Sequence, residues 1–78
     1  MAGSPKPLVS AIIPVLNEED TIPKLLGSLR HENRIETIVV DGGSSDGTVV
    51  RSGGRADKVL TVTGGRAKQL NGGAAEAS

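Results

Sequence analysis

The chain has 78 residues, with nine basic and nine acidic side chains and no cysteine, Phe, Trp or Tyr. Its length allows one small domain with a thin margin of stability, because a short chain buries a smaller share of its surface. The composition excludes disulfides and thiolate zinc sites, and without clustered Lys and Arg we expect no nucleic-acid partner. Residues 1–7 lack the apolar core of a signal peptide, and no apolar run approaches the roughly 20 residues that span a bilayer. We therefore expect a short disordered lead-in at 1–7, one domain over 8–78 and a cytoplasmic protein.

Short apolar segments rich in β-branched residues predict buried strands at residues 8–13, 35–40 and 58–62. Between the first two, apolar side chains recur at helical spacing: Ile22, Leu25, Leu26 and Leu29. Asn17 is a suitable N-cap for this helix, and the acidic residues 18–20 would favour its amino end. Pro23 suits a first turn, so we expect the helix to begin late or bend there.

Two further helices are predicted after the second and third strands. A segment from Asp46 to Arg51 can form one or two turns before Gly53 and Gly54 end it. Residues 66–77 contain many helix formers, but Gly72 and Gly73 interrupt them, so this helix should be weak unless it packs on something.

Strands that alternate with helices predict a three-layer α/β unit with a parallel sheet of about three strands in the order 3-2-1. Parallel sheets of this kind bind ligands at the carboxyl ends of their strands. The loops to inspect are therefore 14–17, 41–48 and 63–66, and these loops hold the unusual residues of the sequence.

Each loop has an ordinary interpretation beside a functional one. Asp41, followed by Gly42 and Gly43, could accept hydrogen bonds from a base or a ribose; composition alone favours a plain turn with Asp46 as a helix cap. Residues 14–18 could line a base pocket, although a capped helix start explains them better. Arg66 lies at a helix amino end, where a cation is unfavourable. A diphosphate bound at this helix end would offset the unfavourable position of the cation. An Arg66 side chain that points to solvent explains the position equally well.

Together the three segments resemble the family 2 inverting glycosyltransferases of GT-A fold. They are the segment from Ile12 to Glu19, the segment from Ile38 to Thr48 and the segment from Gly65 to Ala74. The nearest branch of the family carries a VVDGGSSDGT loop and a GRAxQMNxGA helix. The commoner form of the family has Asp-Asp-Gly-Ser, and here Gly42 stands in place of the second Asp.

The resemblance implies half of a Rossmann-like GT-A domain that binds a nucleotide-diphosphate sugar, with UDP as the expected nucleotide, for transfer to an acceptor hydroxyl. Asp41 would contact the base, and Arg66 would lie near the base and phosphates. The residues that the resemblance assigns to nucleotide binding are Pro14, Asn17, Glu18, Asp41, Gly43, Ser44, Arg66 and Asn71.

The sequence departs from the family in the parts that perform transfer. Family members carry an Asp-x-Asp-type motif that holds a divalent metal, Mn or Mg, on the diphosphate, and a later carboxylate acts as base. No Asp-x-Asp occurs in the sequence, and the sequence ends at Ser78, about where the family's fourth strand would begin, so we expect both the metal site and the base to be missing. We therefore expect a truncated chain that is inactive alone, from a parent that could associate with a membrane.

A non-catalytic α/β module that self-associates through an open sheet edge is the alternative. The sequence contains neither a P-loop nor a G-x-G-x-x-G motif. His31 is interpreted as a solvated cation at a helix end.

Overall fold

A computed structural model describes residues 9–29 and 34–77. The predicted lead-in at 1–7, Leu8 and His31 lie outside these residues. The elements, in chain order, are strand β1 (Val9–Val15), helix α1 (Ile22–Leu29), strand β2 (Ile35–Asp41), helix α2 (Thr48–Ser52), strand β3 (Lys58–Thr61) and helix α3 (Arg66–Glu76).

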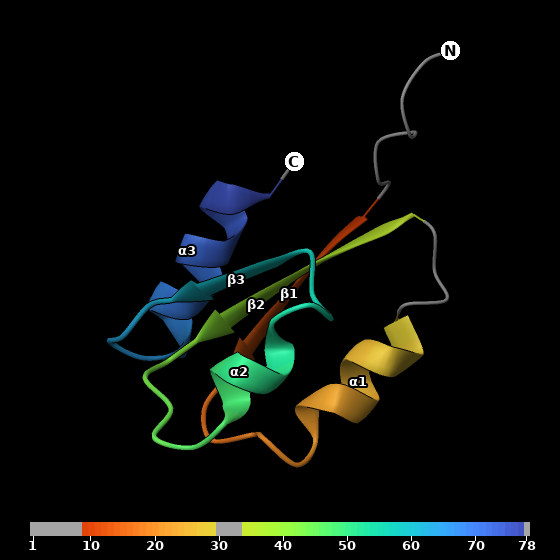
Figure 1. Ribbon diagram of the computed structural model, residues 1–78. Helices are drawn as coiled ribbons and strands as arrows, with labels where there is room; N and C mark the ends of the chain where they lie inside the picture. The colour runs from red at the N-terminus through yellow and green to blue at the C-terminus, as the bar shows by residue number, and fades with distance from the viewer. Residues whose placement is uncertain (1–8, 30–33, 78) are drawn as a thin grey trace.

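The three strands form one parallel sheet in the order β1-β2-β3, with β2 in the centre. Figure 1 shows α1 and α2 in front of this sheet and α3 behind it. The predicted three-layer α/β arrangement is therefore confirmed, as is the strand order. The strand β2 is buried along all but its first residue, as expected of a central strand covered on both faces.

The first strand was predicted to end at residue 13, but β1 continues through Pro14 to Val15. Proline lacks the backbone N–H that a strand uses for pairing, so it is tolerated where a strand pairs on one side only. Within the described residues β1 pairs with β2 alone, so this strand tolerates a proline at position 14.

One face of the sheet holds the main apolar cluster. Val15, Ile22, Leu26 and Val39 are its buried members, and Ile13, Ala56 and Val59 pack against them. The helical stripe predicted at 22–29 is thus only partly buried. Ile22 and Leu26 face the sheet with almost no exposure, whereas Leu25 is 43% exposed.

The other face is covered by α3, which approaches the sheet through its two glycines. A Cβ added to Gly73 would lie 2.4 Å from Cγ2 of Ile12 and 3.0 Å from Cγ2 of Val40. A Cβ on Gly72 would lie 2.9 Å from Cγ2 of Val62. These glycines weaken the isolated helix, but they permit close contact with the sheet, which gives α3 the packing partner that its sequence requires.

The predicted N-cap role of Asn17 is wrong. The helix α1 begins at Ile22, five residues later, and has no acidic residue in its first turn. Asn17 instead has a φ of 52°, in the left-handed region that Asn tolerates better than most residues. The N–H groups of Thr21 and Ile22 both donate to the carbonyl of Glu18, so a turn separates the acidic residues from the helix. Pro23 then occupies the first helical turn, as expected.

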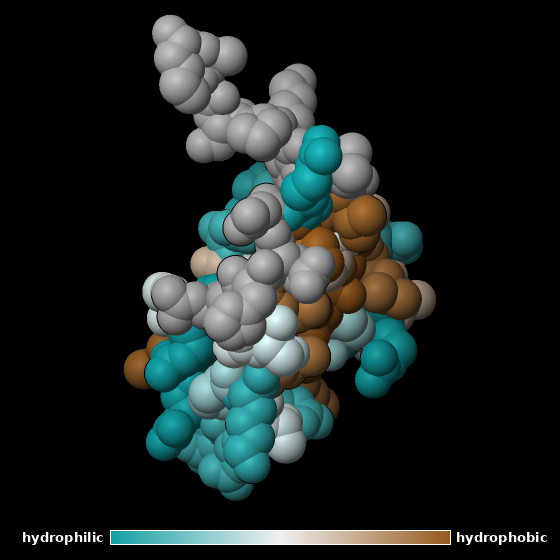
Figure 2. Space-filling view, turned by 90° about the vertical axis from the view of Figure 1, so that its right-hand side faces the viewer, coloured by the Kyte–Doolittle hydropathy of each residue, from teal (hydrophilic) through white to brown (hydrophobic). Residues whose placement is uncertain are grey.

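Within the part of the chain that the structure describes, no helix is long and apolar enough to cross a membrane. Figure 2 shows one face of the molecule, on which apolar side chains gather in a central band between hydrophilic regions.

Candidate functional site

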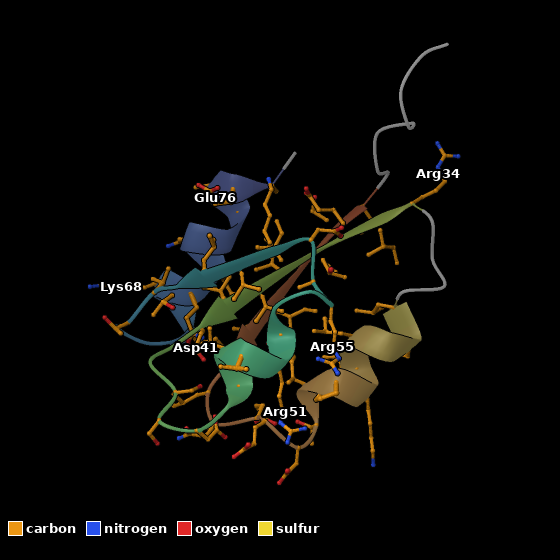
Figure 3. All side chains as sticks on the ribbon, in the orientation of Figure 1. Arg34, Asp41, Arg51, Arg55, Lys68 and Glu76 are labelled. Carbon is orange, nitrogen blue, oxygen red and sulfur yellow. The ribbon has the colours of Figure 1, made fainter. Side chains whose placement is uncertain are left out.

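Three loops follow the carboxyl ends of the strands. They connect β1 to α1, β2 to α2 and β3 to α3, and they hold most of the residues that the sequence singles out. Figure 3 places Asp41 at the end of the arrow of β2.

Asp41 is buried, with 2% of its surface exposed, and its carboxylate holds its own loop together. One oxygen, Oδ2, accepts hydrogen bonds from the N–H of Gly43 at 2.9 Å and of Ser44 at 2.8 Å. The other, Oδ1, accepts from the hydroxyl of Ser44 at 2.5 Å. Gly43 has a φ of 105°, which a side chain would disfavour, so glycine is needed there for this turn.

Burial of Asp41 and the nearby charge of Asp46 raise the pKa of the Asp41 carboxyl. The hydrogen bonds from Ser44 and Gly43 outweigh both effects and hold this pKa below its ordinary value of 3.8. The loop therefore favours the ionised carboxylate.

Acid is expected to loosen this loop. Because the pKa of Asp41 is lower in the folded chain, its stabilisation is complete above the ordinary value of 3.8 and is lost as the pH falls through the folded value. Urea unfolding at a series of pH values from about 2 to 6 measures the effect. Asp41→Asn removes the titration, so its unfolding free energy should fall less steeply in acid than that of the wild type. Parallel curves for the two proteins would contradict this assignment.

The loops after β1 and β2 are joined by hydrogen bonds. The N–H of Asn17 donates to the hydroxyl of Ser44 at 2.8 Å, and Oδ1 of Asn17 accepts from the N–H of Ser45 at 2.9 Å. The N–H of Glu18 donates to the buried hydroxyl of Thr48 at 2.8 Å. These contacts bring Asn17, Glu18, Gly43 and Ser44 of the predicted site close to Asp41.

Asp46 lies one residue before Gly47, the N-cap of the short helix α2, and its carboxylate binds the start of this helix. One of its oxygens accepts from the N–H of Thr48 at 3.0 Å and from the Thr48 hydroxyl, and the other accepts from the N–H of Glu19 at 3.3 Å. These bonds, that of the Thr48 side chain foremost, lower the pKa of Asp46. The N-cap position is occupied by Gly47 and not by Asp46 as the ordinary interpretation predicted, but the Asp46 carboxylate still binds the first N–H of the helix and an N–H of the loop after β1.

The third loop brings α3 to the same edge of the sheet. Gly64 and Gly65, with φ values of 111° and 102°, turn the chain into the helix. Arg66 is exposed at the first position of α3, and its side chain makes no hydrogen bond or ion pair with any described residue. Figure 3 shows Lys68 pointing away from the sheet.

Asn71 is not brought to the other site residues. It is exposed on α3, two residues beyond the buried Gln69. Two residues correspond to about 200° around a helix, so Asn71 lies on the side of α3 opposite to the one that contacts the sheet.

Sequence reasoning missed Gln69 and Thr48. Gln69 is buried, and its Nε2 donates to the carbonyls of Val15 at 3.1 Å and Val40 at 2.8 Å. The sequence does contain a pattern that indicates the burial of Gln69. Gln69, Gly72 and Gly73 are spaced i, i+3 and i+4, so they share one face of a helix. A stripe of small residues marks the face that touches the sheet, and a polar residue on it needs partners there.

The described residues do not fit the divalent cation that the resemblance implies. Among residues 9–29 and 34–77, no group of three His, Cys, Asp or Glu is close enough to hold a metal ion. The acidic side chains of this edge instead bind backbone N–H groups and hydroxyls.

The model of the family described as Glycosyl transferase family 2 matches residues 10–78. The chain belongs to glycosyltransferase family 2. The predicted family is therefore confirmed, and the fold is that of a fragment of its Rossmann-like GT-A domain.

Among family relatives, glycosyltransferase AglE of Haloferax volcanii is 46% identical over 46 residues, covering 54% of this chain and 15% of AglE. Glucosyl-3-phosphoglycerate synthase of Mycobacterium tuberculosis has a TM-score of 0.74 and 29% identity, over 90% of this chain and 30% of that one. A complex of the same enzyme with Mn²⁺, uridine diphosphate and glucosyl-3-phosphoglycerate has a TM-score of 0.73 and 28% identity, over 88% and 30% of the two chains. The chain thus spans less than a third of the length of these relatives.

Proposed function

We propose that this chain forms part of the donor site of a glycosyltransferase that takes a UDP-sugar and transfers the sugar with inversion to an acceptor hydroxyl. The observation that carries the proposal is Asp41 at the tip of the central strand, in a loop interlocked with the loop after β1. Loops at the carboxyl ends of parallel strands are where open α/β sheets bind nucleotides. The similar synthase of M. tuberculosis has a structure in complex with UDP, which supports the choice of base.

The proposed roles follow the positions of the residues. Residues 14–18 and the loop of Gly43 and Ser44 would form the walls of a nucleotide pocket, with Asp41 oriented toward the base. Arg66 would approach the phosphates, because it is exposed at the amino end of α3 and is not engaged by another described residue. A guanidinium and the amino end of a helix both favour phosphate. Asn71 is a weaker candidate, since it is turned away from these loops.

Transfer itself would need groups that the described residues do not supply. The Mn²⁺ in the complex of the M. tuberculosis synthase supports a divalent cation in the whole enzyme, with Mn and Mg both open. We propose that its ligands and the catalytic base come from elsewhere in a longer protein. A cytoplasmic location stays a prediction of the sequence.

Isothermal titration calorimetry of the chain with UDP tests the proposal. We expect saturable binding, weaker for uridine because it lacks the diphosphate that Arg66 would contact. Arg66→Ala should reduce the preference for UDP over uridine. Lys24→Ala, an exposed cation on α1, is the matched control and should leave it unchanged. Equal heats for UDP and for buffer would reject the proposed donor site.

Self-association is a second candidate, favoured by the open edges of the sheet. Within the described residues β1 and β3 each pair on one side only, and Val9 at the start of β1 is 55% exposed. Unpaired edges of this kind can pair with another copy. Size-exclusion chromatography with light scattering would detect a dimer, and a monomer at all concentrations would exclude this candidate.

A further inference from the structure

Gln69 connects three elements at the carboxyl edge of the sheet. It lies in the first turns of α3, is 7% exposed, and donates from Nε2 to the last residue of β1 and to Val40 of β2. Both partners are carbonyl oxygens, so the amide nitrogen, and not the amide oxygen, must face the sheet. The side chain therefore fixes the amino end of α3 relative to the ends of both strands.

Gly42 lies directly against this amide. A Cβ at position 42 would be 3.1 Å from Cδ, Nε2 and Oε1 of Gln69. Gly42 does not have a positive φ, unlike Gly43. A Cβ at position 42 would therefore crowd the Gln69 amide, so glycine is favoured there for space and not for backbone conformation. The N–H of Gly42 and Nε2 of Gln69 also donate to the same carbonyl, that of Val15.

We propose that Gln69 is a positioning residue of the donor site and that it and Gly42 form a matched pair. This inference rests on the proposed function, because its effect on affinity assumes that the site binds UDP. Through Gly42, the Gln69 amide holds the start of the loop that Asp41 organises. Through α3, it sets the distance between that loop and Arg66. The pair is also consistent with the departure from the commoner family sequence, because even the Cβ of an Asp at position 42 would crowd the Gln69 amide.

Gln69→Glu and Gly42→Ala test the proposal from its two sides. The first keeps the shape of the side chain but replaces a donor facing two carbonyls with a carboxylate. The second keeps the amide but pushes it away from the carbonyls. We expect each to weaken UDP binding by about tenfold, the equivalent of one hydrogen bond of 1.4 kcal/mol. Gly42→Ala combined with Gln69→Ala should bind UDP better than Gly42→Ala alone, because the clash is then removed.

Amide hydrogen exchange of Gly43 and Ser44 in the free chain gives a second readout that needs no ligand. Their N–H groups are bonded to Asp41, and we expect faster exchange in both single variants. The control is Thr37→Val, which removes hydroxyl bonds to Asp57 at the opposite end of β2. It should lower stability without changing UDP affinity or the exchange of these two amides.

The outcomes separate this inference from the proposed function. If the wild type does not bind UDP, the donor site fails, and faster loop exchange in the variants still supports the matched pair. UDP affinity within twofold of the wild type for both single variants, or loop exchange like that of Thr37→Val, would overturn the role of Gln69.

Discussion

Gly73→Ala is expected to lower the free energy of unfolding by about 2 kcal/mol, within the range for overpacking a closely packed core. The added methyl group would lie 2.4 Å from Cγ2 of Ile12 and 3.0 Å from Cγ2 of Val40. Val40 is fully buried in the central strand, so α3 must move outward to relieve the overlap. The hydrogen bonds of Gln69 to the sheet would lengthen with it. Urea unfolding followed by circular dichroism measures the loss.

Gly27→Ala is the matched control, the same substitution on the other face of the sheet. Gly27 lies in α1, and an added Cβ there would have no atom within 4 Å. Alanine is the better helix former, so we expect this variant to gain about 0.5–1 kcal/mol. Effects of the same sign at both positions would contradict the packing that we assign to α3.

Asp41→Ala is expected to abolish measurable UDP binding and to cost about 1–3 kcal/mol of stability. It removes the acceptor of three hydrogen bonds, from the N–H of Gly43 and from the N–H and hydroxyl of Ser44. Ser44 in turn holds Asn17, so disorder in one loop should spread to the other. Titration calorimetry with UDP and urea unfolding, made on the same sample, separate the two effects.

Asp57→Ala serves as the control for charge and stability. The Asp57 carboxylate accepts hydrogen bonds from the N–H and hydroxyl of Thr37, near the other end of the same strand. This variant loses the same charge and comparable bonds, yet should bind UDP like the wild type. If both Asp variants lost UDP affinity in proportion to their loss of unfolding free energy, Asp41 would have no specific role in the site.

The fold was largely predictable because its strands are short, apolar and separated by turn residues. The segment 35–40 ends in three apolar residues, Ile38 to Val40, as is typical of a strand buried on both faces, and it lies in the central strand β2. Boundaries were less predictable where tertiary contacts override local preference. Asn17 is a good cap in isolation, but its side chain bonds to Ser45, 28 residues away, and no local pattern encodes that contact.

The positions of the candidate residues in the fold could be predicted from the sequence, but the hydrogen bonds between them could not. The family order of the motifs placed Asp41, Asn17 and Arg66 at one edge of the sheet. In the structure Asp41 ends β2, Asn17 lies in the loop after β1, and Arg66 begins α3. The part of Gln69 could not be derived from one sequence, because it depends on how closely α3 approaches β1 and β2. The close contact of α3 with the sheet also favours glycine at position 73. The sequence alone indicates only that Gly73 weakens the helix.

The central claim is that the carboxyl edge of this sheet binds the UDP portion of a sugar donor. Titration of UDP into ¹⁵N-labelled chain, followed by amide chemical shifts, tests it most directly. We expect saturable shifts confined to residues 14–18, 41–46 and 65–69. No shifts, or shifts centred on the amino ends of the strands near Thr37 and Asp57, would contradict it.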